Sequence, residues 1–266
     1  MKEIIITKND SGQRTDKFLM KYFSKAPKSF VYKMLRKKRI KLNGAKAGGA
    51  EMLNEGDSIQ MYLSEETMDG FKEERVIKKA SSDIDVVYED ENIIAVNKPA
   101  GVLSHAEKAG DDDTLIDRIL SYLNEKGEYD PEKERTFVPA LCTRLDRNTS
   151  GIVIAGKNSE ALRQINEAVK FKSIKKYYKT LVCGKIEKSG RLEDFYEKDS
   201  QLNKAKVGGK EGKIITTIYR PLKTNGRYTL AEVELITGKS HQIRVHMASA
   251  GFPIIGDVKY GNKQEN

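Results

Sequence analysis

Apolar positions near the start of the chain recur with the period of two amphipathic helices. Within residues 14–25 they stand four positions apart, Phe18 with Tyr22 and Leu19 with Phe23. Pro27 interrupts this pattern, and Ser29 is a candidate N-cap for a second helix. The apolar face of that second helix consists of Phe30, Val31, Met34 and Leu35. The pattern predicts two consecutive helices that each bury one face.

A period of two follows these helices. Residues 40–42 lead into Asn43-Gly44, a dipeptide that favours a hairpin turn, and residues 58–63 alternate apolar with polar side chains. The same reasoning predicts strands at about 84–88, 93–96, 178–183, 214–219 and 229–236, and helices at about 114–123, 159–169 and from 240 to Gly251 and Pro253, with Ser240 as a candidate N-cap. We therefore expect an α+β fold with a mixed, mainly antiparallel sheet rather than a doubly wound parallel sheet.

The distribution of charge divides the chain. Residues 64–82 are charged, weakly periodic and poor in large apolar groups, which is typical of a linker. The expected organisation is a small α+β domain at 1–63, a linker at 64–82 and a larger domain at 83–266.

The composition of the chain indicates which class of molecule it binds. The 266 residues contain 48 Lys and Arg against 39 Asp and Glu, a net charge of +9, which favours a polyanion such as nucleic acid. No apolar run approaches the roughly 20 residues that span a bilayer, and the amino terminus lacks the apolar core of a signal peptide. We expect a cytoplasmic protein that does not bind a membrane.

Cysteine and histidine positions give no sign of a metal centre. Cys142 and Cys183 are far apart in sequence and form no C-x-x-C motif. Among His105, His241 and His246, the last two stand five apart, which is off the spacing that places two ligands on one helical face. The sequence predicts neither a disulfide nor a structural metal.

The stretch LCTRLDRNTSGIVIAG, residues 141–156, carries the strongest chemical signal. It sets Asp146 between Arg144 and Arg147, just before an apolar run. Neighbouring guanidiniums favour the charged form of a carboxylate, so Asp146 should stay ionised and is a candidate nucleophile. The alternative is a salt-bridged turn residue at the entrance to a buried strand.

This stretch resembles the signature H-R-L-D-x-x-T-S-G-L of the RluA branch of RNA pseudouridine synthases. The matching residues are Arg144, Leu145, Asp146, Thr149, Ser150 and Gly151, and Thr143 replaces the leading His. The resemblance implies a synthase that isomerises uridine to pseudouridine within RNA, with Asp146 as the catalytic group. It implies no cofactor, and the absence of the nucleotide-binding patterns G-x-G-x-x-G and G-x-x-x-x-G-K-[ST] agrees.

Three further blocks resemble the same family. Residues 238–246, GKSHQIRVH, are similar to G-R-x-H-Q-I-R-x-H with Lys239 in place of the first Arg, and the likeness continues to Asp257, Tyr260 and Gly261. It implies that Arg244 pairs with the Asp146 carboxylate. KKYYKTLVCG implies that Tyr178 is the active-site aromatic, the alternative being a core residue of a strand. VNKPAGVLSH, ending at His105, implies a turn near the site and no catalytic role.

The amino-terminal pattern resembles the RNA-binding module of small-subunit ribosomal protein S-four. Its two predicted helices have a cationic edge and precede a small sheet. The basic residues that the resemblance assigns to RNA binding are Lys33, Arg36, Lys37, Lys38 and Arg39. The alternative is an ordinary solvated basic face.

Together these features predict an RNA pseudouridine synthase that acts on structured RNA as a monomer, with large-subunit ribosomal RNA as the expected substrate. Arg144 is the candidate to fill the stack that the flipped base leaves, and Arg147 with Lys172, Lys175 and Lys176 would hold phosphates. Transfer RNA is an alternative substrate. A non-catalytic ribosome-assembly factor is an alternative function, and a glycoside hydrolase is a third, for which Glu232 and Glu234 would be the nearest second carboxylates.

Overall fold

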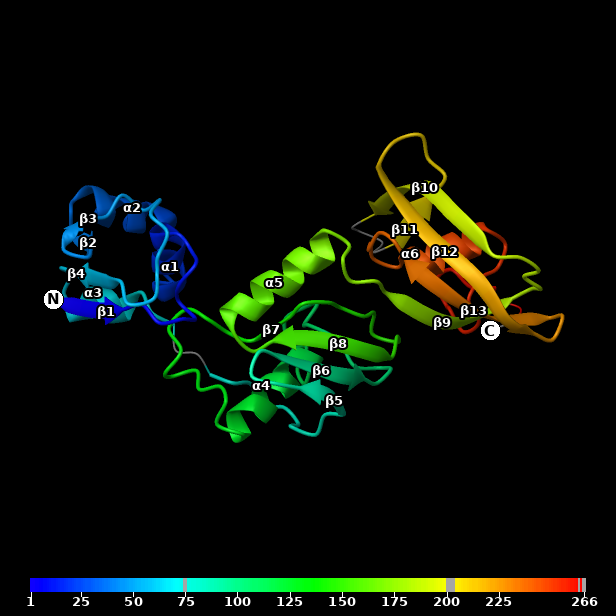
Figure 1. Ribbon diagram of the computed structural model, residues 1–266, viewed down its shortest axis with the longest axis horizontal. Helices are drawn as coiled ribbons and strands as arrows, with labels where there is room; N and C mark the ends of the chain where they lie inside the picture. The colour runs from blue at the N-terminus through cyan, green and yellow to red at the C-terminus, as the bar shows by residue number, and fades with distance from the viewer. Residues whose placement is uncertain (74–75, 200–203, 263, 265–266) are drawn as a thin grey trace. The chain divides into compact units, whose positions relative to one another are not determined.

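The computed structural model describes residues 1–73, 76–199, 204–262 and 264 (Figure 1). The chain forms two compact units, residues 1–167 and residues 168–266. Residues 74 and 75 of the expected linker lie outside the described residues. Every strand pairing within the described sheets is antiparallel.

The first unit begins with a small α+β layer. Its elements are β1 (Lys2–Ile5), α1 (Thr15–Tyr22), α2 (Lys28–Arg36), β2 (Ile40–Leu42), β3 (Ala45–Lys46), β4 (Ser58–Met61) and α3 (Glu65–Gly70). The strands form a sheet in the order β1-β4-β2-β3. The expected hairpin turn is confirmed, because Asn43 and Gly44 both have positive φ, at 51° and 78°.

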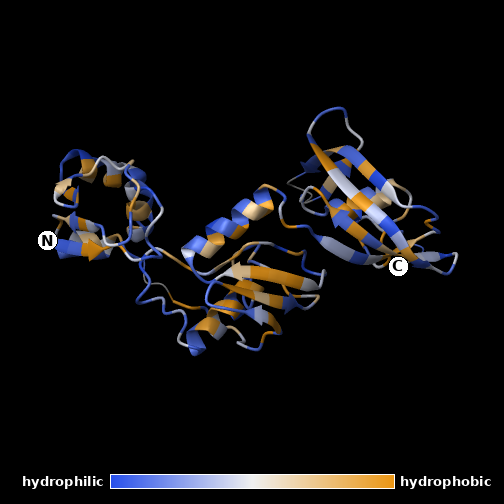
Figure 2. Cartoon of the chain, viewed as in Figure 1, coloured by the Kyte–Doolittle hydropathy of each residue, from blue (hydrophilic) through white to orange (hydrophobic). Residues whose placement is uncertain are grey.

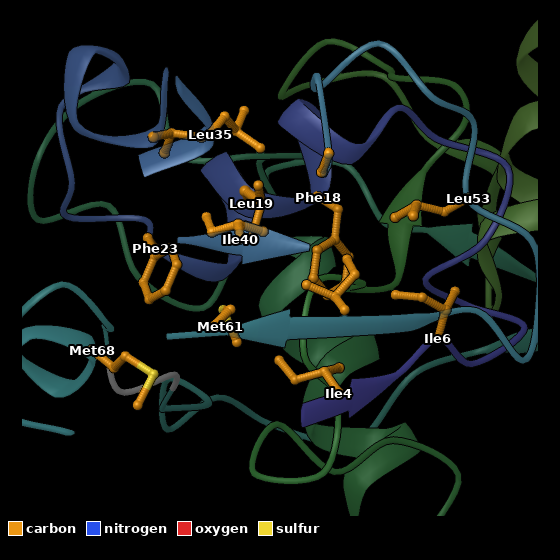
Figure 3. Close-up of a cluster of buried hydrophobic side chains, with 13 residues drawn as sticks. Ile4, Ile6, Phe18, Leu19, Phe23, Leu35, Ile40, Leu53, Met61 and Met68 are labelled. Carbon is orange, nitrogen blue, oxygen red and sulfur yellow. The ribbon is translucent and has the colours of Figure 1, made fainter. Parts of the chain in front are cut away.

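The predicted helical faces fill the core of this layer. Figure 3 shows Phe18, Leu19 and Phe23 of the α1 region with Leu35 and Ile40 around the sheet, and all five are buried. Met68 of α3 joins the same core, so the start of the expected linker is a helix packed on this layer.

The expected cap of α2 is wrong. The helix begins at Lys28 with Pro27 as N-cap, and Ser29 lies inside the first turn. Pro27 has φ −66° and ψ 146°, an extended conformation that the proline ring favours, and it directs the chain into the helix two residues earlier than a Ser29 cap would.

The second part of the first unit is a sheet covered by a helix. The strands β5 (Val86–Glu89), β6 (Ile93–Lys98), β7 (Ala140–Leu141) and β8 (Gly151–Gly156) are arranged in the order β5-β6-β8-β7. Figure 2 shows that β6 and β8 are largely hydrophobic. Their buried residues pack against the apolar face of α4 (Leu115–Glu125), which starts at a Thr114–Asp117 capping box, and α5 (Ser159–Lys170) follows β8.

The second unit is a five-stranded sheet with one helix. The strands β9 (Tyr177–Cys183), β10 (Gly190–Asp199), β11 (Lys204–Val207), β12 (Lys213–Thr224) and β13 (Tyr228–Leu235) are arranged in the order β11-β10-β12-β13-β9, and α6 (Gln242–Ser249) follows. The predicted cap of α6 is wrong: the N-cap is His241, in a left-handed conformation at φ 57°, and not Ser240.

The expected α+β fold class is confirmed by these layers. Within the described ranges no helix has both the length and the apolar character needed to cross a membrane.

Candidate active site

The register of two strands brings two loops together. β6 and β8 are antiparallel, with Lys98 opposite Gly151. The chain that leaves β6 and the chain that enters β8 therefore lie at the same end of the sheet, and these are the segments 99–105 and 142–150. The VNKPAGVLSH and RLDRNTSG blocks, about fifty residues apart in sequence, thus meet through ordinary strand pairing.

Backbone hydrogen bonds fix the chain on the carboxyl side of Asp146. The Gly101 N–H donates to the carbonyl of Arg147 at 2.8 Å, and Nε of Arg147 donates to the carbonyl of Gly101 at 3.0 Å. Gly101 has φ 90°, a conformation that a side chain would strain. The reciprocal pair needs this glycine turn.

A serine fixes the chain on the other side. Oγ of Ser104 donates to the carbonyl of Leu145 at 2.8 Å and accepts from the Leu145 N–H at 3.1 Å. The Thr149 N–H donates to the Asp146 carbonyl at 3.0 Å and closes a turn. Asp146 is half-buried, so its carboxylate stands on a backbone that is held on both sides and still reaches solvent.

Lys98 is the residue that the sequence reading underestimated. Its side chain is fully buried, and Nζ donates to the carbonyls of Pro99, Val102 and Arg147 at 2.9, 2.7 and 3.0 Å. Burial lowers the pKa of Lys98, and the negative charge of Asp146 acts in the opposite direction. The ammonium ties the two loops together and adds a positive charge to the surroundings of Asp146.

His105 was also assigned no role, and it lies in the same cluster. Burial lowers the pKa of His105, the positive charge of Arg144 lowers it further, and Asp117 acts against both. The imidazole is therefore neutral at pH 7. Its Nδ1 is buried and has no hydrogen-bond partner among the described residues.

The two arginines that flank Asp146 are both exposed. Arg147 is partly anchored through its Nε bond to Gly101, and Arg144 lies close enough to His105 for its positive charge to lower the pKa of that imidazole. The loop that carries Asp146 therefore also carries two exposed guanidiniums.

In the second unit, Tyr178 lies on β9 opposite Val233 of β13. Tyr178 is half-buried and its neighbour Tyr177 is 53% exposed, so the two rings point to opposite faces of the sheet. Nearby, burial lowers the pKa of the half-buried Lys176. The expected phosphate ligands Lys172 and Lys175 are exposed.

Arg244 on α6 pairs with a carboxylate that the sequence reading did not select. Its Nε donates to Oδ2 of Asp257 at 2.7 Å, and Nη2 donates to Oδ1 at 2.8 Å. The guanidinium also lies over the Tyr260 ring, 5.2 Å from its centroid. The expected partner, Asp146, belongs to the other unit, and that pairing stays a proposal.

The other polar residues of the HQIRVH block hold α6 against β12. Gln242 is buried and donates through Nε2 to the carbonyl of Thr216 and to Oγ1 of Thr217, both at 3.0 Å. His246 is fully buried, with Nδ1 2.8 Å from Oγ1 of Thr217 and Nε2 3.5 Å from Asp194. The block thus has a side that attaches the helix and another side, with Arg244, that carries charge.

A comparison with known protein families shows to which family the chain belongs. Residues 92–249, more than half of the chain, match the profile of the family described as RNA pseudouridylate synthase. This chain belongs to the RNA pseudouridine synthase family. The matched range contains Lys98, Asp146, Tyr178 and Arg244, while Asp257 and the amino-terminal layer lie outside it.

Curated relatives agree with this assignment. The chain is 30% identical over 259 residues to an uncharacterized RNA pseudouridine synthase of Aquifex aeolicus, covering 96% of this chain and 78% of that one. It is 32% identical over 262 residues to ribosomal large subunit pseudouridine synthase D of Borreliella burgdorferi, with the same coverages. It is 34% identical over 274 residues to ribosomal large subunit pseudouridine synthase C of Rickettsia bellii, covering 97% of this chain and 86% of that one. The protein is an RNA pseudouridine synthase, an isomerase.

Solved structures share the fold. Human RNA pseudouridylate synthase domain containing 1 superposes with a TM-score of 0.57 at 22% identity, over 71% of this chain and 74% of that chain. Human RNA pseudouridylate synthase domain containing 4 gives 0.54, also at 22% identity, over 68% and 70%. The fold class read from the hydrophobic pattern is therefore that of a pseudouridine synthase.

Two remaining sets of residues complete the description of this synthase. The basic residues of the amino-terminal layer are all exposed, at the end of α2 and in the following turn: Lys33, Arg36, Lys37, Lys38 and Arg39. Glu232, considered for a second catalytic carboxylate, accepts from Nε of Arg220 at 2.7 Å on a sheet face. Within the ranges that the structure describes, no three His, Cys, Asp or Glu side chains gather as a metal ion would require.

Proposed function

We propose that this synthase converts uridine to pseudouridine in large-subunit ribosomal RNA, with Asp146 as the group that attacks the nucleotide. The substrate class is supported by the names of relatives from Borreliella burgdorferi and Rickettsia bellii, both ribosomal large subunit synthases. These two relatives carry different letters, D and C, at 32% and 34% identity. The choice of uridine thus rests on experiment.

The reaction needs one ionised carboxylate held in place. The bond from the ribose anomeric carbon to the base nitrogen breaks, the base turns, and a bond from the same sugar carbon to a base carbon forms. A proton leaves that base carbon and the nitrogen gains one, so the product is an isomer. A carboxylate can start this by attacking the sugar or by removing a sugar proton.

Asp146 is suited to this task because the backbone of both neighbours is fixed. Ser104 binds Leu145 through two hydrogen bonds, and Gly101 exchanges two with Arg147. A fixed backbone limits where the carboxylate can stand, and positioning of this kind accounts for a large part of enzymatic rate enhancement. The observation that carries the proposal is this two-sided attachment of Asp146 next to the buried Lys98 ammonium.

Tyr178 and Arg244 are proposed to complete the site. A uracil within a helix must leave its stack, which costs a few kcal/mol, and stacking on the Tyr178 ring would offset part of that cost. Arg244 would pair with the Asp146 carboxylate and hold its orientation. Arg144, exposed on its loop, would fill the vacated stack.

The amino-terminal layer is proposed to hold the RNA near the site. Its exposed cations lie at the end of α2 and in the turn that follows, where they would contact backbone phosphates. Because phosphate contacts carry no sequence information, this layer would set affinity and orientation, and the catalytic residues would select the uridine.

Incubation with two RNAs tests the proposal. The purified chain is mixed separately with unmodified large-subunit ribosomal RNA and unmodified transfer RNA, and pseudouridine is mapped chemically at single-nucleotide resolution. We expect pseudouridine at discrete positions of the ribosomal RNA. Product in transfer RNA alone would overturn the substrate assignment, and RNA binding without product in either RNA would favour a non-catalytic assembly factor.

A further inference from the structure

A turn after α6 encloses the Arg244 side chain from two directions. Asp257 contacts the Nε and Nη2 edge of the guanidinium with both carboxylate oxygens, and Tyr260 covers one face of the same group. We call Asp257 and Tyr260 the arginine clamp. Both lie beyond residue 249, where the match to the family profile ends, and within the stretch whose resemblance to the family continues to Gly261.

Asp257 is itself held firmly. Its side chain is only 4% exposed, and Oδ1 accepts from the backbone N–H groups of Lys259 and Tyr260 at 2.9 and 3.1 Å. Burial alone would raise the pKa of Asp257, but the bonds from Arg244 and from these N–H groups lower it. The carboxylate is therefore ionised at neutral pH and cannot turn without losing several hydrogen bonds.

Tyr260 is anchored to two other elements. Its hydroxyl accepts from the Ala205 N–H of β11 at 2.7 Å and lies 3.0 Å from Nδ1 of His241 at the start of α6. The ring under the guanidinium is thus fixed to the sheet and to the helix that carries Arg244. Neither half of the clamp depends on a flexible side chain.

A clamp of this kind changes what an arginine on a helix can do. A guanidinium has two edges that present paired N–H groups, and a carboxylate that takes Nε and Nη2 directs the Nη1 side away from itself. An arginine side chain otherwise samples many rotamers, and that freedom is lost each time it must engage a target. Asp257 and Tyr260 hold the Arg244 side chain in one orientation before RNA binds.

We propose that Asp257 is a positioning residue for Arg244, which holds the guanidinium, over the Tyr260 ring, in the orientation that the isomerisation step requires. This role rests on the proposed function, in which Arg244 serves the Asp146 carboxylate. Asp257 does not touch the RNA or the reacting atoms in this account. Its contribution reaches the reaction through Arg244.

The role predicts a specific kinetic signature for Asp257→Asn. The amide keeps the size of the side chain but places an NH2 group or a single oxygen against two donors, so the two-pronged contact is lost. Single-turnover rates on the ribosomal RNA should fall roughly 10- to 100-fold, because misplacement of a catalytic group costs about that much. The Kd for the RNA should stay within about twofold, since phosphate contacts elsewhere set affinity.

A double-mutant cycle separates positioning from a direct role. In an Arg244→Ala background, Asp257→Asn should lower the rate by less than about twofold, because the residue through which it acts is gone. Glu232→Gln is the matched control: it breaks the Arg220–Glu232 pair, another carboxylate–guanidinium contact of the same unit, and should leave the rate unchanged. Two results would overturn the role. One is an equal loss of rate from Asp257→Asn in the wild-type and Arg244→Ala proteins, and the other is an unchanged rate when Asp257→Asn is made in the wild-type protein.

Two further measurements keep the outcome interpretable. Thermal unfolding shows whether each variant is folded at the assay temperature, and Asp257→Glu, which keeps the charge but shifts it by one methylene, replaces Asp257→Asn if the latter unfolds. A rate for Asp257→Glu equal to wild type would count against the role. If the wild-type protein makes no pseudouridine, the proposed function fails, whereas an active wild type with an equally active, folded Asp257→Asn refutes only the positioning role.

Discussion

The surroundings of Asp146 and of Arg244 hold a charged side chain in two different ways. Around Asp146 the backbone is fixed: Ser104 and Gly101 bind the neighbouring residues, and the carboxylate itself is half-buried. Around Arg244 the side chain is fixed, because Asp257 grips the guanidinium and Tyr260 lies beneath it.

The difference teaches how each residue can be used. An aspartate has a short side chain, so a fixed backbone limits where its carboxylate can stand, which suits a group that must meet a sugar in one geometry. An arginine has a long side chain with many rotamers, so it becomes a precise electrostatic group only when the side chain is restrained. The comparison predicts that loss of the contacts around the Asp146 backbone lowers both stability and rate, and that loss of the contacts around Arg244 lowers the rate through the Arg244 side chain.

Lys98→Met should have the largest effect on stability. The substitution leaves the carbonyls of Pro99, Val102 and Arg147 without their shared donor, each at about 1 to 3 kcal/mol, and removal of a desolvated charge offsets part of that loss. We expect the free energy of unfolding in urea to fall by on the order of 3 kcal/mol. A loss below about 1 kcal/mol would mean that the Lys98 ammonium does not hold the two loops together.

The pH dependence of the same variant provides a second check. The folded-state pKa of Lys98 lies below its unfolded value of about 10.5, so the unfolded chain binds more protons and wild-type stability rises with pH in the window below that value. The difference in unfolding free energy between wild type and Lys98→Met should therefore grow as the pH is raised from 8 toward 10. A difference that shrinks over this range would show that the ammonium is not under a desolvation penalty.

Ser104→Ala should have an intermediate effect. It removes both hydrogen bonds that hold the Leu145 backbone and leaves two polar groups of that residue unpaired, a loss of about 1 to 3 kcal/mol. The turnover rate should fall as well, because Leu145, which Ser104 holds, directly precedes Asp146. Urea unfolding and single-turnover assays on the same samples check both effects, and Ser81→Ala, in an exposed segment of the same unit, is the control. Full activity in Ser104→Ala would mean that the serine does not position Asp146.

His246→Gln should have the smallest effect on the pH dependence of stability, and that effect should appear in acid. Burial lowers the pKa of His246, and Asp194 counters this in part. The folded-state pKa lies below the unfolded value of about 6.5, so the unfolded state binds the proton more readily and wild-type stability falls as the pH drops from 7.5 to 5.5. The variant should lose less stability over this interval. An equally steep loss in both proteins would place the acid sensitivity elsewhere.

Sequence reasoning works best where neighbours in the chain carry the signal. The helical faces around Phe18 and Leu35 follow a local period, and their burial is confirmed. Asp146 and Arg244 stand inside contiguous motifs, and their catalytic roles stay a prediction. The mistakes at the caps have local causes. Pro27 starts α2 before Ser29, and His241 takes a left-handed conformation that no simple capping rule anticipates.

The missed features depend on contacts between residues that are distant in the sequence. One of the three carbonyls bound by Lys98 belongs to Arg147, which is 49 residues away and is brought close by the β6–β8 register. The Arg244–Asp257 pair spans the end of a helix and a turn. The strand β10 was not predicted because charged side chains interrupt its apolar positions in residues 190–199.

The central claim is that the half-buried carboxylate of Asp146, held on its two-sided backbone attachment, carries the chemistry. Asp146→Asn removes the charge at nearly constant shape, and Asp112→Asn, an exposed carboxylate of the same unit, is the matched control. Pseudouridine formation in ribosomal RNA is measured for wild type and both variants, with RNA binding and thermal unfolding recorded in parallel. The account predicts no detectable product with Asp146→Asn, unchanged binding and folding, and wild-type product with Asp112→Asn. Product from Asp146→Asn at even a tenth of the wild-type rate would contradict it.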